Sequence, residues 1–131
     1  MRAASVLLFA GASILSAGCS DAPDDRPARS VTVPPSKAVE IRAEEYRFDP
    51  GRVVVKEAGA GARLRIVMRN RGKLAHNLNV RKEDRDLASI RSFPPGQERA
   101  VSASLTPGDY ELVCTVADHE DLGMVGKLEV R

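Results

Sequence analysis

Three residues that bind metals through sulfur or nitrogen are evenly spaced near the end of the chain, in CTVADHEDLGM at residues 114–124. Four residues separate Cys114 from His119, and four more separate His119 from Met124. The other histidine, His76, lies far upstream in the segment KLAHNLNV. Thiolate and thioether are soft donors that favour Cu(I), whereas imidazole binds both oxidation states of copper. Together the four residues indicate one copper site.

Each of these residues alone has a simpler interpretation. A cysteine at the end of a strand is most often a small buried hydrophobe, and a methionine often fills a gap in a core. A histidine among leucines is usually a core residue with satisfied hydrogen bonds. The joint pattern favours a metal site, because two His and one Cys with a weak axial Met is the ligand set of blue-copper electron-transfer sites. Closed zinc sites instead prefer two to four cysteines.

The chain from residue 38 onward has the pattern of an all-β domain. Apolar and polar residues alternate over short stretches, and Pro-Gly pairs or the triplet Asn-Arg-Gly separate these stretches. Strands with one apolar face are buried most simply in two packed sheets, so we expect a Greek-key β-sandwich or barrel of about seven to eight strands. The charged segment at residues 81–92 is an exception, which we expect to be a loop or a short helix.

This pattern places the candidate ligands at one end of the sandwich. His76 shares its parity with Leu74 and Leu78, so its side chain is expected to point into the apolar interior. A later strand ends at Cys114, which shares a face with Leu112. The loop that carries the second histidine and the methionine then leads into the last strand.

The first 18 residues are similar to an export signal. A short positive start precedes an apolar run at residues 3–18, which is too short for a comfortable membrane span and ends in small side chains. Cys19 follows Ala17 and Gly18, which resembles the lipobox of bacterial lipoproteins, although Ser16 stands where that motif usually has Leu. We therefore expect Cys19 to be lipidated; the alternative is an ordinary cleaved signal with an incidental cysteine.

Three parts of the chain follow from these patterns. Residues 1–18 form the signal peptide, residues 19–37 form a lipidated, proline-rich tether, and residues 38–131 form the folded domain. The protein is expected to be exported to the periplasm or the cell surface and anchored to a membrane through Cys19. A disulfide between Cys19 and Cys114 is a disfavoured alternative, because Cys19 lies at a flexible terminus.

The folded domain resembles the cupredoxins, small type 1 copper proteins such as plastocyanin, azurin and auracyanin. The segments that carry the resemblance are YRFDPGRVVVKEAG, AHNLNV, TPGDYELVC and CTVADHEDLGMVGKLEV. The resemblance implies that His76, Cys114 and His119 bind one copper ion per chain. It also implies that Met124 is the axial ligand.

The same resemblance implies a brace beside the ligands. Asn77 matches the family residue that supports the ligand loop, and Thr115 is its expected hydrogen-bond partner; contacts of this type orient metal ligands and tune the metal. The family commonly surrounds its second histidine with apolar or small residues. Here Asp118, Glu120 and Asp121 flank that histidine, which suggests an acidic rim that attracts a basic partner or merely solubilises the loop.

The leading functional hypothesis is a one-electron carrier that docks with redox proteins such as c-type cytochromes or membrane oxidoreductases. The alternatives are a copper storage or delivery protein, and a metal-free interaction domain. An enzyme is not expected, because the chain has only two histidines and a second copper centre would need more. The net charge of +2 and the lack of a basic cluster with aromatic residues argue against nucleic-acid binding. We expect a monomer.

Overall fold

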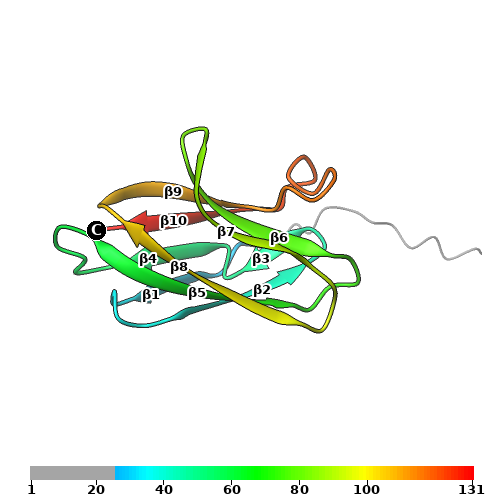
Figure 1. Cartoon of the computed structure of the whole chain (residues 1–131), viewed down its shortest axis with the longest axis horizontal. Coiled ribbons are helices and arrows are strands. Elements are labelled where there is room, and N and C mark those ends of the chain that lie inside the picture. Colours follow the sequence, from blue (N-terminus) through cyan, green and yellow to red (C-terminus); the bar gives the residue numbers. More distant parts are fainter. Residues whose placement is uncertain (1–25) are drawn as a thin grey trace, which may run out of the picture.

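The computed structural model describes residues 26–131, in which ten strands and no helix are present (Figure 1). The strands are β1 (Ser30–Val33), β2 (Val39–Glu44), β3 (Arg47–Asp49), β4 (Arg52–Val55), β5 (Ala62–Asn70), β6 (His76–Lys82), β7 (Arg85–Phe93), β8 (Glu98–Leu105), β9 (Gly108–Val113) and β10 (Val125–Val130). No helical stretch in this part of the chain has the length and hydrophobicity that crossing a bilayer requires.

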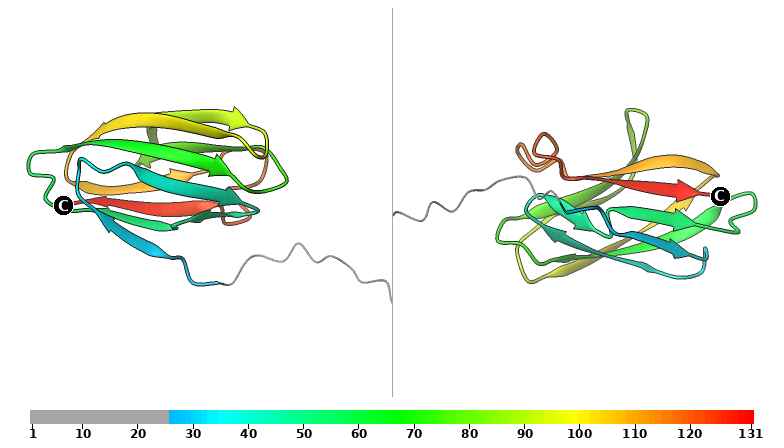
Figure 2. Two further views of the ribbon diagram at one scale, coloured as in Figure 1. Left: turned by 90° about the horizontal axis from the view of Figure 1, so that it is seen from below. Right: turned by 180° about the vertical axis from the view of Figure 1, so that it is seen from behind.

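The strands form two sheets that face each other (Figure 2). The larger sheet has the order β1-β4-β10-β9-β6-β7, and the smaller has the order β3-β2-β5-β8. Strands β1 and β10 both pair in parallel with β4, β2 pairs in parallel with β5, and the remaining pairs are antiparallel. The predicted all-β sandwich is confirmed, with ten strands instead of seven to eight.

The core lies between the sheets and consists mainly of aliphatic side chains. Strand β5 shows why, because Leu64, Ile66 and Met68 are fully buried while Arg63 and Arg65 on the same strand are exposed. Alternation with a period of two places one set of side chains in the core and the other in solvent. Each such burial stabilises the fold by about 1.5–3 kcal/mol before the loss of chain entropy is counted.

The prediction of a loop or short helix at residues 81–92 is wrong, because most of this segment belongs to strand β7. Residues Arg85–Phe93 pair antiparallel with β6 at the edge of the larger sheet. Only Ile90 and Phe93 of this strand are buried. The alternation that normally reveals a strand is therefore absent, because an edge strand that is mostly exposed does not need an apolar face.

The folded domain starts earlier than expected, because it includes strand β1. Ser30–Val33 pairs residue by residue with Arg52–Val55, so the sandwich begins before the expected boundary at residue 38 and includes part of the expected tether. Only Val33 of β1 is buried, and prolines follow it. The hydrophobic pattern therefore gave no sign of a strand there. The expected signal peptide and Cys19 lie outside the described residues.

The ends of three strands meet at one pole of the sandwich. Strand β6 begins with His76, β9 ends immediately before Cys114, and β10 begins immediately after Met124. The connection between β9 and β10, coloured orange in Figure 1, lies at this pole, opposite the C-terminus. Tyr110 helps to place β9, because its buried ring carries a hydroxyl that donates a hydrogen bond of 2.7 Å to the carbonyl oxygen of Thr106.

Candidate metal centre

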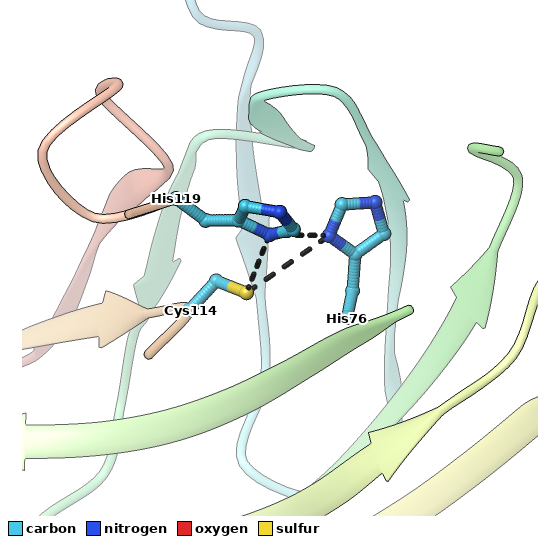
Figure 3. Close-up of side chains that lie close together, drawn as sticks. All are labelled: His76, Cys114 and His119. Carbon is cyan, nitrogen blue, oxygen red and sulfur yellow. Dashed lines mark hydrogen bonds between the residues drawn. The ribbon is translucent and has the colours of Figure 1, made fainter. Parts of the chain in front are cut away.

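His76, Cys114 and His119 point toward one another at this pole (Figure 3). The Nδ1 atoms of the two histidines lie 3.2 Å apart. The Cys114 Sγ atom lies 3.9 Å from Nδ1 of His76 and 3.5 Å from Nδ1 of His119. Residues far apart in the sequence thus bring two nitrogens and one sulfur into a small triangle.

The size of this triangle fits a metal ion. A triangle with sides of 3.2, 3.5 and 3.9 Å has a circumradius of about 2.1 Å, so one point in its plane is equidistant from the three atoms. Bonds from zinc, a metal ion of similar size to copper, are about 2.0–2.1 Å to imidazole nitrogen and about 2.3 Å to thiolate sulfur. The three side chains can therefore bind one ion with little rearrangement.

Burial sets the protonation of His76 and Cys114. His76 and Cys114 are fully buried, and His119 is 3% exposed. Burial raises the pKa of the Cys114 thiol and, outweighing the hydrogen bond to Glu45, lowers the pKa of His76. The free site thus holds a neutral imidazole at His76 and a thiol at Cys114, which carries no disulfide. Because thiolate is the form that binds metal, binding must release a proton.

Backbone hydrogen bonds close the loop that carries two of these residues. The N–H of Cys114 donates to the carbonyl of Met124 at 3.2 Å, and the N–H of Met124 donates to the carbonyl of His119 at 2.9 Å. Gly123 has a φ of +95°, a conformation that favours glycine, and it turns the chain back toward β10. The loop therefore fixes the backbones of Cys114, His119 and Met124 relative to one another. Met124 is fully buried.

The expected brace between Asn77 and Thr115 is present. The Asn77 side-chain amide donates to the Thr115 hydroxyl at 2.9 Å, and the Thr115 N–H donates to the Asn77 side-chain oxygen at 2.8 Å. Asn79 donates a further hydrogen bond of 3.2 Å to the same hydroxyl. These contacts join the start of β6 to the residue after Cys114. They therefore restrain His76 and Cys114, two corners of the triangle, relative to each other.

Two residues of the turn between β2 and β3 also contact the site, and the sequence patterns did not reveal them. The Glu45 carboxylate accepts a hydrogen bond of 3.0 Å from Nε2 of His76, and the ring of Tyr46 meets the ring of His119 edge-on with centroids 5.0 Å apart. Neither is spaced regularly from a ligand, so only the folded structure shows their position.

The exposure of Leu74 differs from the expected alternation. It shares its parity with His76 but is 44% exposed, because it precedes β6 in a loop held by other contacts. The Leu74 N–H donates to Glu45, and its carbonyl accepts from the side-chain amide of the buried Asn70. The loop thus directs Leu74 outward and the next strand residue, His76, inward.

The acidic residues beside the second histidine differ in their environments. Glu120 accepts a hydrogen bond of 2.9 Å from the Arg81 guanidinium, which also pairs with Asp86. Asp118 and Asp121 are exposed. One of the three acids is therefore partly neutralised within the chain.

The chain matches no protein-family model. It is 25% identical over 129 residues to the copper-resistant cuproprotein CopI of Rubrivivax gelatinosus, an alignment that covers 86% of this chain and 76% of that protein.

Solved structures match the fold closely. Dithionite-reduced auracyanin from Roseiflexus castenholzii superposes with a TM-score of 0.65 at 18% identity, over 73% of this chain and 98% of auracyanin. Rusticyanin from Thiobacillus ferrooxidans superposes with a TM-score of 0.63 at 19% identity, over 85% of this chain and 88% of rusticyanin. The chain therefore has the cupredoxin fold, and His76, Cys114 and His119 form its candidate metal site.

Proposed function

We propose that the protein is an extracytoplasmic mononuclear type 1 copper protein that carries single electrons between redox partners. The triangle of two imidazole nitrogens and one thiol sulfur, buried in a cupredoxin fold, is the observation that supports this proposal. Bound copper would supply the redox chemistry by alternating between Cu(I) and Cu(II). His76, Cys114 and His119 would hold the ion, and Met124 would be its weak axial ligand.

The surrounding residues suit a site that changes little when an electron arrives or leaves. The hydrogen bonds of Asn77 and Thr115 and the closed loop between β9 and β10 restrain the ligands. Burial keeps water from adding as a further ligand. A ligand set held in place by the protein reduces the rearrangement that accompanies electron transfer, which favours a carrier over a site that must release its metal.

The position of the N-terminal segment supports a membrane-associated carrier. Arg26 and Ala28 line the same surface hollow as Leu122 and Gly123 of the ligand loop, so the described chain starts at the metal pole. Cys19 is seven residues before Arg26, and seven extended residues span at most about 25 Å. With a lipid on Cys19, the metal pole would stay close to the membrane surface. The proposed partners are therefore membrane oxidoreductases or c-type cytochromes, and no enzymatic activity is proposed.

A copper-handling role is the second candidate. The relative named for copper resistance favours it, because a protein of that kind could bind copper without passing electrons. The two functions differ in what happens to the metal. A storage or delivery protein must release Cu(I), whereas a carrier must keep it through many redox cycles.

Redox cycling of the copper-loaded protein separates the two functions. The copper-loaded protein should have a visible absorption band from charge transfer between the Cys114 thiolate and copper. We expect ascorbate to bleach this band and an oxidant to restore it over repeated cycles, with the copper content of the protein unchanged after desalting. The reduced protein should also resist removal of copper by a Cu(I) chelator. Rapid loss of Cu(I) to the chelator would contradict the carrier and support copper handling.

A further inference from the structure

Glu45 connects the turn between β2 and β3 with the loop before β6 and with His76. It lies in the turn between β2 and β3, and its Oε1 atom accepts hydrogen bonds of 2.8 Å from the N–H groups of both Lys73 and Leu74. The same oxygen lies 3.0 Å from Nε2 of His76. One carboxylate oxygen therefore fixes the loop before β6 and the outer nitrogen of a candidate ligand.

These contacts determine which nitrogen of His76 carries the proton. A neutral imidazole has one N–H, and a carboxylate can only accept, so the proton lies on Nε2. The Nδ1 lone pair is then directed toward Cys114 and His119, as the ring orientation in Figure 3 shows.

The carboxylate also places a negative charge behind the ligand. The Glu45 side chain is 24% exposed. Its Oε1 atom accepts hydrogen bonds from the N–H groups of Lys73 and Leu74 and faces Nε2 of His76, and several donors around one oxygen favour the charged form of a carboxyl group. A carboxylate bonded to the outer nitrogen makes imidazole a more basic metal ligand. More basic ligands stabilise the more highly charged Cu(II).

We propose that Glu45 is a positioning residue, which holds His76 in the Nε2–H tautomer and favours oxidised over reduced metal at the site. The first part concerns the metal-free protein, and the second part rests on the proposed copper function. Glu45 acts through His76, because it contacts the outer Nε2 atom and is not one of the three residues that would hold the ion.

The tautomer can be tested without copper. Long-range proton–nitrogen NMR correlations distinguish the two tautomers, and the chain has only two histidines to assign. We expect His76 to be protonated on Nε2 in the native protein and in Glu45→Gln, whose amide oxygen can still accept. Glu45→Ala should lose this preference. A native His76 that is protonated on Nδ1, or that exchanges between tautomers, would overturn the positioning role.

The charge effect is tested by the reduction potential of the copper-loaded protein. Glu45→Gln preserves size and should raise the potential, with a change of roughly tenfold in the preference for Cu(II) over Cu(I), or about 59 mV. Glu44→Gln is the matched control, because it removes the same charge at the neighbouring position and Glu44 is not among the described hydrogen-bond partners of His76. Equal shifts in the two variants, or no shift in Glu45→Gln, would overturn the charge effect.

The two tests separate this inference from the proposed function. If the native protein gives no thiolate-to-copper absorption, the copper function fails, while the NMR result still decides the positioning role. If the absorption is present and the tautomer or the potential behaves otherwise, only the role of Glu45 fails.

Discussion

Met124 is the candidate ligand whose contribution is most easily separated from metal binding itself. In the proposed site it is a weak axial donor, and the axial ligand tunes the redox potential of such sites. We expect Met124→Leu to keep copper and its visible band, because the three strong ligands remain. The loss of an electron-donating ligand should destabilise the more highly charged Cu(II) and so raise the potential, with a change of roughly tenfold in the preference for Cu(I), or about 59 mV. Voltammetry of the two proteins checks this, and an unchanged potential would argue against the axial role.

The buried ligands also predict how the stability of the metal-free protein depends on pH. The lowered pKa of His76 means that its contribution is present above about pH 6.5, the ordinary value for the unfolded chain, and is lost as pH falls further. The raised pKa of Cys114 means the opposite, with its contribution lost above about pH 8.5.

The free energy of unfolding should therefore be greatest between these two values. Denaturant titrations from pH 5 to 10 measure it, and Cys114→Ser should remove the decline on the alkaline side alone, since a serine hydroxyl does not ionise there. An alkaline decline of equal size in that variant would show that other groups cause it.

At the residue scale, the candidate ligands and the brace of Asn77 and Thr115 could be predicted, whereas the contacts of Glu45 and Tyr46 could not. Residue chemistry and regular spacing identified Cys114, His119 and Met124 together, and strand parity directed His76 inward. Glu45 and Tyr46 contact the site only because the turn between β2 and β3 folds over the same pole. That proximity arises from the parallel pairing of β2 with β5, which no local pattern encodes.

At the scale of elements, the brace between β6 and the ligand loop gives a test of how the site is held. Asn77→Ala removes both hydrogen bonds to Thr115 and should lower the free energy of unfolding by about 1 kcal/mol, since water can reach the exposed Thr115 and replace part of the loss. Thr115→Val is the comparison. It keeps the bond from its backbone N–H to Asn77 but removes both bonds to its hydroxyl, and it should cost more because the buried Asn79 amide is left without that partner. Urea titrations of the metal-free variants check this order, and the reverse order would contradict it.

The elements that the sequence patterns missed have a common physical cause. Strands β1 and β7 are the two edges of the larger sheet, and both are mostly exposed. An edge strand gains its stability from backbone pairing on one side, so its side chains need not alternate. Central strands such as β5 bury one full face and were recognised for that reason.

At the scale of the whole molecule, the position of β1 predicts where the chain can be shortened. A protein that starts at residue 38 lacks β1 and exposes the surface that Val33 covers, so it should lose at least about 2 kcal/mol of stability. A protein that starts at residue 26 retains the strand and is the control. Thermal unfolding of the two metal-free proteins measures the difference. Equal stability would mean that β1 contributes nothing and that the domain starts at residue 38.

The central claim is that His76, Cys114 and His119 bind one copper ion, and optical titration with Cu(II) tests it most directly. We predict an intense visible thiolate-to-copper band that saturates at one copper per chain and that is absent from Cys114→Ser. Copper binding without this band, or the same band in Cys114→Ser, would contradict the assignment.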